Sequence, residues 1–207
     1  MNAYDRLDRA LAKTAEAVRG RTRTGRTHDD ADDVVGTLAT DGAIDFDPRP
    51  LLRALHRAGA PVVVIGQVAG ILHGSAELTG DLDLLWDGDP RHTPALAAGF
   101  AAIGAELTDD DGRPLPCGPE SFLLPKVQFV APTVSGDACT PALPWGELEV
   151  RDYLQRSQRL QTPEGWSIGY LRASDLITMR LAAGRPKDLR RADELIALGR
   201  ERLAGSI

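Results

Sequence analysis

The most constraining feature of the chain is a pair of strand-like segments on either side of a glycine and a short apolar stretch. The first segment, Val62 to Ile65, consists of four β-branched residues, which fits a strand buried on both faces. Gly66 interrupts it, and residues 67–73 predict a short helix that ends at Gly74. A second strand is predicted from Asp81 to Trp86. The chain should therefore fold around a β-sheet flanked by helices.

Two carboxylates, Asp81 and Asp83, stand one residue apart in the second of these strands. Alternate residues of a strand point to the same face, so both side chains should project together while Leu82 and Leu84 face the core. Adjacent carboxylates repel each other unless protons or a cation lie between them, and Mg²⁺ prefers oxygen ligands of this kind. An exposed edge strand would show the same alternation, so the pattern alone leaves both interpretations open.

The other predicted helices have apolar residues at three- and four-residue intervals or recognisable end signals. They cover residues 3–19, 50–58, 93–102 and 152–157, followed by two C-terminal helices, the first capped by Ser174 and ended by Gly184, the second opened by Pro186. Further strands are predicted at residues 126–130 and 147–150 and near Arg159 and Ser167, and a loop at 109–120. Residues 21–33 are polar throughout and predict a mobile linker. We therefore expect three parts, 1–46, 47–170 and 171–207.

Composition narrows the class of protein. The chain has 207 residues, of which 43% are hydrophobic, enough for a substantial core. Its longest apolar stretch, residues 60–72, is shorter than the roughly 18 residues of a membrane span. The N-terminus does not resemble a secretory signal, so we expect a cytoplasmic protein without a membrane partner. Cys117 and Cys139 lack zinc-site spacing, and the net charge of −6 argues against indiscriminate binding to nucleic acid.

The order of these parts resembles the nucleotidyltransferase superfamily. In that family an apolar strand is followed by Gly and then Gly or Ser, and about a dozen residues later by Asp-x-Asp or Asp-x-Glu between apolar residues. Here Gly66-Gln67 precedes Asp81-Leu82-Asp83 by thirteen residues. The segments 64–74 and 79–83 resemble the minimal nucleotidyltransferases that include abortive-infection toxins. The resemblance implies an α+β nucleotidyltransferase fold, a small mixed β-sheet flanked by helices, with an N-terminal helix and a C-terminal helical pair.

The C-terminal residues 173–189 look like the two-helix ending of the same group, with a basic residue on the first helix and an Arg-x-Lys-Asp turn. The resemblance implies transfer of a nucleoside monophosphate from an NTP to a hydroxyl on RNA or protein, and a cognate antitoxin if the chain is a toxin. Asp81 and Asp83 would hold Mg²⁺ or Mn²⁺. The implied nucleotide-binding residues are Gly66, Gln67, Arg180, Arg185, Lys187 and Asp188.

Three departures from the family pattern bear on activity. Gln67 stands where Gly or Ser is usual and adds bulk where phosphate should approach. Glu77 stands where many relatives carry Arg. The third catalytic carboxylate, expected on the next central strand, aligns with Gln128, which cannot accept a proton as a carboxylate does. Alternative donors of this carboxylate are Glu120, Glu147 and Glu149.

Two other functions stay open, of which these departures motivate the first. The first is a nucleotidyltransferase fold that no longer catalyses and binds a nucleotide or a protein partner. The second is a different nucleotide-binding α/β domain, although the region around Gly66 lacks the GxGxxG and GxxxxGK[ST] patterns.

Overall fold

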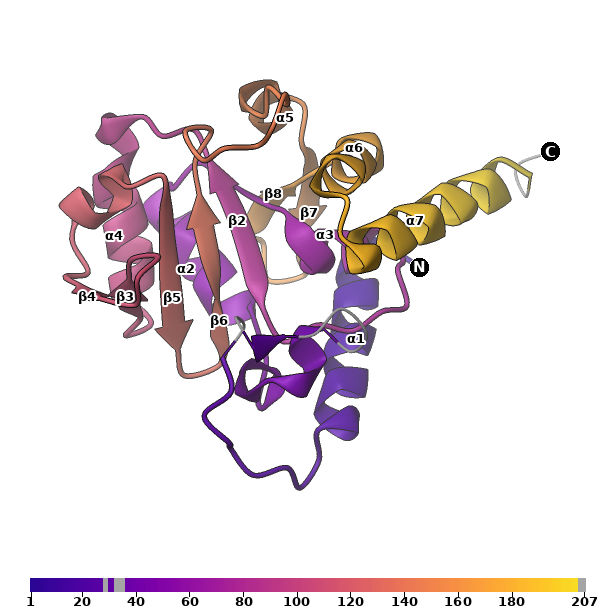
Figure 1. The fold of residues 1–207 in the computed structure, drawn as a ribbon, viewed down its shortest axis with the longest axis horizontal. Helices are drawn as coiled ribbons and strands as arrows, with labels where there is room; N and C mark the ends of the chain where they lie inside the picture. The colour runs from indigo at the N-terminus through magenta and orange to yellow at the C-terminus, as the bar shows by residue number, and fades with distance from the viewer. Residues whose placement is uncertain (28–29, 32–35, 205–207) are drawn as a thin grey trace.

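The computed structural model describes residues 1–27, 30–31 and 36–204. Within them, eight strands form one mixed sheet in the order β4-β3-β5-β6-β2-β1-β8-β7 (Figure 1). The β1–β8 and β2–β6 pairs are parallel, and the other neighbours are antiparallel. The strands are β1 Val62–Val64, β2 Leu82–Trp86, β3 Glu106–Thr108, β4 Pro114–Leu115, β5 Lys126–Ala131, β6 Val134–Cys139, β7 Gln158–Gln161 and β8 Ser167–Tyr170.

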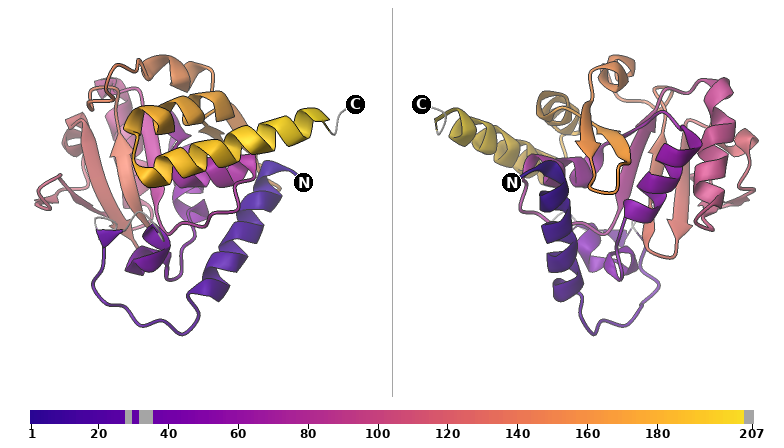
Figure 2. Two further views of the ribbon diagram at one scale, coloured as in Figure 1. Left: turned by 45° about the vertical axis from the view of Figure 1, so that its right-hand side comes forward. Right: turned by 180° about the vertical axis from the view of Figure 1, so that it is seen from behind.

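The helices lie on both faces of this sheet. They are α1 Ala3–Ala17, α2 Arg49–Ala58, α3 Gly66–His73, α4 Thr93–Ala101, α5 Arg151–Gln155, α6 Ala173–Ala183 and α7 Pro186–Ala204. Short 3₁₀ turns cover Thr37–Ala39, Asp41–Ala43, Pro90–His92 and Pro119–Leu123. Figure 2 shows α2 and α4 against one face, with α6 and α7 toward the other. The C-terminal half of α7 projects from the body. The described chain is thus a mixed α/β protein, which agrees with the predicted α+β class.

The core lies between the sheet and helices α2 and α4. Leu82 and Leu84 of β2 are fully buried there, and Phe100 of α4 meets Phe129 of β5 edge to face with ring centroids 5.0 Å apart. Leu7 of α1 is buried in the same cluster. Burying these side chains fixes which face of β2 points inward. The other face of β2 therefore points toward α6 and α7.

Most predicted elements are present near their expected positions. The predicted strand at 147–150 is absent, since these residues are turn and irregular backbone, and the strand that follows β5 is instead β6, Val134–Cys139. The sequence of β6, Val-Ser-Gly-Asp-Ala-Cys, has few β-branched or aromatic residues, so its composition does not indicate a strand. Helix α6 begins after Arg172 rather than at a cap formed by Ser174.

Part of the predicted linker 21–33 lies outside the described residues, namely 28–29 and 32–33. The described part is held by hydrogen bonds that the prediction of a mobile linker did not anticipate. The Arg21 guanidinium donates to the carbonyl oxygens of Leu38 at 2.6 Å and Ala39 at 3.0 Å. The amide of Gly25 donates to Asp41 Oδ2 at 2.7 Å. Among the described helices, none is both long and apolar enough to cross a bilayer.

Candidate functional site

A cavity of about 520 Å³ lies where β2 and β6 face helices α6 and α7. Its volume falls within the range of small-molecule sites. The walls combine a glycine turn with carboxylates from the strands and basic side chains that come mostly from the helices. The charged residues of the wall are Asp81, Asp83, Asp137 and Asp188 together with Lys126, Arg180, Arg185, Lys187 and Arg191.

Asp81 and Asp83 both line this cavity, as the alternation of the strand predicted. The intervening Leu82 and the following Leu84 are fully buried on the opposite face. The apolar face of β2 can be buried in only one orientation, so packing against α2 and α4 turns both carboxylates toward the cavity. The paired carboxylates are therefore a wall of an internal site, and the edge-strand interpretation does not apply, because β2 lies between β1 and β6.

A third carboxylate, that of Asp137, lies beside Asp83. Strand β6 pairs in parallel with β2, and the register places Asp83 opposite Asp137. Burial raises the pKa of Asp83 well above its usual range, and the charges of Asp81 and Asp137 raise this pKa further. Three carboxylates thus repel one another at one end of the cavity. Asp137 was not among the predicted site residues, because the composition of β6 does not indicate a strand.

Gln128 does not occupy the position expected for the third carboxylate. It lies on β5, one strand further from β2, directly opposite Asp137 across the β5–β6 pair. Thr108 Oγ1 donates to Gln128 Oε1 at 3.3 Å. In the described wall of the cavity Gln128 is absent, as are the alternative donors Glu120, Glu147 and Glu149. The prediction of Gln128 was wrong because spacing along the sequence does not show which strand lies next to β2. That strand is β6 and not β5.

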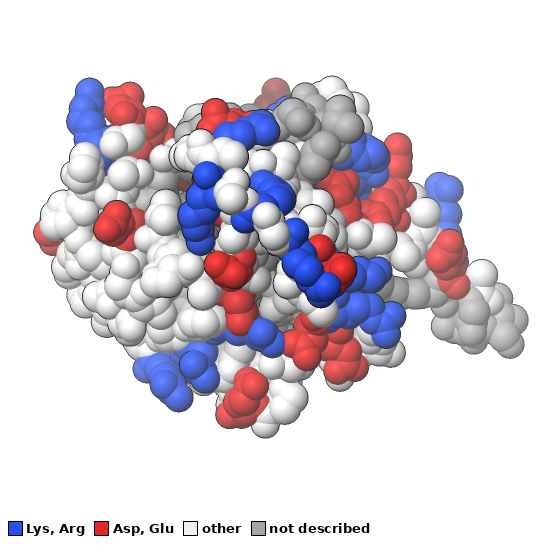
Figure 3. All heavy atoms as spheres, turned by 90° about the horizontal axis from the view of Figure 1, so that it is seen from below, with Lys and Arg blue, Asp and Glu red and all other residues white. Residues whose placement is uncertain are grey.

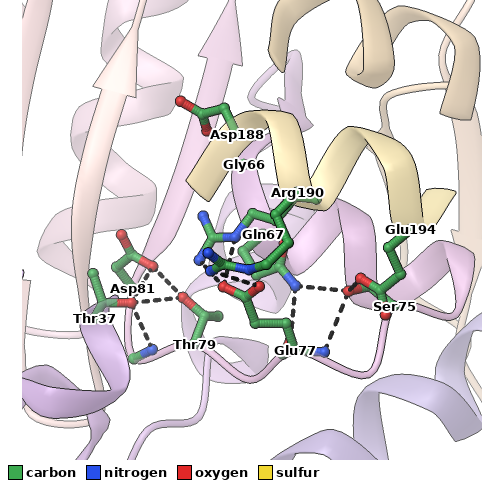
Figure 4. Close-up of polar contacts among 12 residues, drawn as sticks. Thr37, Gly66, Gln67, Ser75, Glu77, Thr79, Asp81, Asp188, Arg190 and Glu194 are labelled. Atoms are coloured by element: carbon green, nitrogen blue, oxygen red, sulfur yellow. Dashed lines mark hydrogen bonds and ion pairs between the residues drawn. The ribbon is translucent and has the colours of Figure 1, made fainter. Parts of the chain in front are cut away.

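Two threonine hydroxyls hold Asp81 in place (Figure 4). Thr37 Oγ1 donates to Asp81 Oδ1 at 2.9 Å, and Thr79 Oγ1 donates to the same oxygen. Thr37 also accepts a hydrogen bond of 3.1 Å from the amide of Gly80. Thr37 belongs to the N-terminal part of the chain, for which the sequence offered no site residue. The orientation of Asp81 therefore depends on a segment outside the predicted core.

Gly66 forms a tight turn at the start of α3 with φ of +62°, a conformation that favours glycine. A Cβ atom at this position would lie 1.9 Å from Asp83 Oδ2, so no side chain fits beside that carboxylate. The first amides of a helix lack intrahelical acceptors and favour negative charge nearby. The glycine therefore brings the N-terminus of α3 into close contact with the carboxylate end of the cavity.

The side chain of Gln67 is engaged in a buried network. Its Nε2 donates to Ser75 Oγ at 2.9 Å and to the carbonyl oxygen of Glu77 at 2.7 Å, while its Oε1 accepts from Arg180 at 2.8 Å. Although Gln67 is part of the cavity wall, the side chain is only 2% exposed. The amide thus acts as a brace between α3, the loop before β2 and α6, which explains how Gln is accommodated where a smaller residue was expected.

Arg180 connects three elements from inside the protein. It donates to the carbonyl oxygens of Arg191 at 2.9 Å and Gly66 at 3.3 Å, in addition to Gln67. Burial, followed by the nearby charge of Arg191, lowers the pKa of Arg180 to about 10. The guanidinium remains protonated at neutral pH. Arg180 thus clamps the glycine turn to α7 and contributes a positive charge to the cavity wall.

The acidic Glu77 is paired with α7. Arg191 donates to Glu77 Oε1 at 2.7 Å through Nε, and Arg190 donates to Oε2 at 3.2 Å. Next to it, Ser75 Oγ donates to Glu194 Oε2 at 2.5 Å (Figure 4). The reversed charge at position 77 is therefore balanced by arginines of α7, and the loop before β2 is fastened to that helix.

The Arg-x-Lys-Asp turn also reaches the cavity. Arg185, Lys187 and Asp188 all line it, and Arg185 Nε pairs with Asp188 Oδ2 at 2.5 Å. The structure therefore brings together all the sequence-predicted site residues except Gln128. Across the face drawn in Figure 3, acidic and basic side chains of the described residues are interspersed. That face resembles a mixed-charge surface more than a wide basic one.

The donor types fit a divalent cation, because Asp81, Asp83 and Asp137 supply carboxylate oxygens from neighbouring backbone positions. The raised pKa of Asp83 reflects repulsion that a cation would relieve. In the described part of the chain, however, no three His, Cys, Asp or Glu side chains are arranged closely enough to hold a metal ion. Binding a cation would therefore require the carboxylates to turn about their side-chain torsions. No protein-family model matches the chain, and no curated protein matches it.

Proposed function

We propose that this protein is a metal-dependent nucleotidyltransferase that moves a nucleoside monophosphate from an NTP to a hydroxyl group. The observation that carries the proposal is the convergence on one cavity of Asp81, Asp83 and Asp137, the Gly66 turn and the basic residues of α6 and α7. Carboxylates on one side and cations on the other match the needs of a metal-bound triphosphate. The nucleotidyltransferase fold suggested by the sequence belongs to the same proposal.

Each group has a role that its position supports. The amides at the start of α3 face the triphosphate, and the Gly66 turn allows its close approach. Arg185 and Lys187 balance the charge that develops on the departing pyrophosphate. Asp81 and Asp83 would hold one or two Mg²⁺ ions, which would supply charge neutralisation at the phosphates. Asp137 takes the part that the family pattern gives to its third carboxylate, in place of Gln128.

The reaction joins the acceptor oxygen to the α-phosphorus and breaks the bond from that phosphorus to the pyrophosphate. The acceptor hydroxyl loses its proton as the new bond forms. Asp137 is the carboxylate that we assign to accept this proton, because it stands beside Asp83 and an ionised carboxylate can act as a general base.

Transfer can be tested with the full chain and each of the four NTPs carrying a labelled α-phosphate, with Mg²⁺ or Mn²⁺. Total RNA and cell-lysate protein serve as separate acceptors. We expect label in one acceptor pool and its loss in Asp83→Asn. Asp152→Asn, an exposed carboxylate on α5, is the matched control and should retain activity. The absence of transfer by the wild type, or equal transfer by Asp83→Asn, would contradict the proposal.

One observation favours a second function, a nucleotide-binding protein without transferase activity. The carboxylates of the described residues do not already form a metal-holding cluster. This alternative predicts NTP binding that does not depend on Mg²⁺ and no transfer to either acceptor. Calorimetry with and without Mg²⁺, run beside the transfer assay, separates the two functions.

A further inference from the structure

The wall of the cavity changes character along α6. Four residues of this helix line the cavity at positions that share one helical face: Leu176, Met179, Arg180 and Ala183. The first two, Leu176 and Met179, are apolar. Arg180 follows, and then the charged turn that opens α7. The lining contributed by α6 therefore begins with apolar side chains, and Arg180 and the turn after Ala183 form the charged end of the cavity.

Further apolar side chains of the wall come from the segment that follows β6. Strand β6 contributes Asp137 and Cys139, and the segment after it contributes Leu143 and Trp145. This segment leads to α5, which lies near α6 in Figure 1. Arg156, at the end of α5, pairs with Asp175 in the first turn of α6 at 3.0 Å. The segment that carries Leu143 and Trp145 is therefore connected through α5 to the start of α6.

Trp145, one of these lining residues, is held in place by the backbone. Its indole Nε1 donates to the carbonyl oxygen of Thr140 at 2.9 Å, so the polar atom of the ring is engaged by the backbone. The side chain is only partly buried, unlike Trp86 and Trp166, which are 1% and 4% exposed. Part of the indole is therefore left to contact whatever enters the cavity, whose wall also includes the apolar side chains of Met179 and Leu143.

We propose that Trp145 and Met179 form the subsite for the nucleobase, which stacks on the indole while the triphosphate lies at the charged end. This inference rests on the proposed function and extends it to the way in which the nucleotide is recognised. Aromatic rings stack with bases, and the thioether of methionine packs well on rings. Because every base has a π-face, stacking holds all four bases with modest preference. We therefore expect an enzyme that accepts more than one NTP.

Binding of the full chain to NTP and to inorganic tripolyphosphate, measured by calorimetry with Mg²⁺, tests the subsite. Trp145→Ala should weaken NTP binding by roughly 5- to 150-fold, the factor for loss of one base–aromatic stack. Binding of tripolyphosphate, which has no base, should not change. Trp145→Phe keeps an aromatic ring and should recover most of the affinity. Leu123→Ala, an exposed side chain outside the cavity wall, is the control and should bind both ligands as the wild type does.

Tryptophan fluorescence of the unaltered protein gives a measurement that does not depend on a variant folding. Trp145 is the one partly exposed tryptophan of the three in the chain, so NTP should quench its emission and tripolyphosphate should not. NTP binding by the wild type without quenching, or equal affinity in Trp145→Ala, would overturn the subsite and leave the proposed function standing. No NTP binding by the wild type would overturn both.

Discussion

Thr37 Oγ1 donates a hydrogen bond of 2.9 Å to Asp81 Oδ1, across 44 positions of sequence. The bond comes from an N-terminal segment that is packed tightly on the start of β2. A Cβ atom on Gly80 would lie 2.5 Å from the amide nitrogen of Ala43, so the two backbones touch where Gly80 stands. The segment is therefore part of the site, and Thr37 is a positioning residue for the first carboxylate.

Thr37→Val should weaken Mg²⁺-dependent transfer by about 10- to 100-fold, the usual cost of losing a hydrogen bond that orients a metal ligand. Thr37→Ser keeps the hydroxyl and should retain most of the activity. The measurement is the transfer rate as a function of Mg²⁺ concentration, and the half-saturating concentration should rise in Thr37→Val alone. Thr178→Val, an exposed position on α6, is the control. Equal Mg²⁺ dependence in the valine and serine variants at position 37 would show that Thr37 does not orient Asp81.

Asp137→Asn should reduce transfer by about 100-fold or more, because it removes the carboxylate assigned as general base. Gln128→Ala should leave the rate nearly unchanged, since Gln128 lies on β5 and is absent from the described cavity wall. Both variants are compared in the same assay with labelled NTP, and circular dichroism checks that each is folded. A larger loss of transfer rate in Gln128→Ala than in Asp137→Asn would indicate that Gln128, and not Asp137, is the third catalytic residue.

Asp83→Asn should stabilise the metal-free protein, because it relieves the repulsion from Asp81 and Asp137. The folded-state pKa of Asp83 lies above its unfolded value, so the wild type loses stability as the pH rises from the usual carboxyl range through the raised pKa. A gain of about 1 kcal/mol would raise the unfolding temperature by roughly 2–4 °C at alkaline pH. Below about pH 4 the gain should vanish, because the carboxylates of the wild type become protonated too.

Mg²⁺ should make the wild type more stable than Asp83→Asn, the opposite of the order expected without metal. A cation that binds only the folded state raises the unfolding temperature of the wild type and has a smaller effect on Asp83→Asn. Thermal unfolding of both proteins over a series of Mg²⁺ concentrations, with Asp152→Asn as a control, measures the effect. If Mg²⁺ stabilised both variants equally, the cation would be binding elsewhere.

Arg180→Ala should lower the free energy of unfolding by roughly 1–3 kcal/mol, because it leaves buried oxygen atoms of Gly66, Gln67 and Arg191 without their donor. Its effect should not add to that of Gln67→Ala, since the two side chains are in direct contact. A double-mutant cycle by urea denaturation should give a coupling energy of about 0.5–3 kcal/mol. The control cycle combines Arg180→Ala with Lys13→Ala on α1. A coupling energy of similar size in that cycle would contradict a specific interaction between Arg180 and Gln67.

Local patterns were sufficient to predict the segment from β1 to β2. Four β-branched residues, a glycine and a short apolar helix each have a strong conformational preference, and these preferences agree with the final fold. The alternation of Asp81 and Asp83 with buried leucines is also local, because it depends only on the two-residue period of a strand. Gly184 and Pro186 correctly marked the break between the two C-terminal helices, although Ser174 does not cap the first, and basic residues of this region reach the cavity.

Pairing between distant segments determined the features of the site that local patterns did not predict. Asp137 lies beside Asp83 because β6, not β5, is the parallel neighbour of β2, and a strand of weak intrinsic preference gains its structure from that pairing. Thr37 reaches Asp81, and Trp145 lines the same cavity as Leu176 and Met179 of α6, because parts of the chain far apart in sequence come together. Strand order and long-range packing depend on the energy of the whole fold, which no local pattern records. The amino-acid order therefore specifies where Asp81 and Asp83 point. The position of Asp137 beside Asp83, the contact of Thr37 with Asp81 and the apolar side chains of the cavity wall arise only when the sheet is assembled.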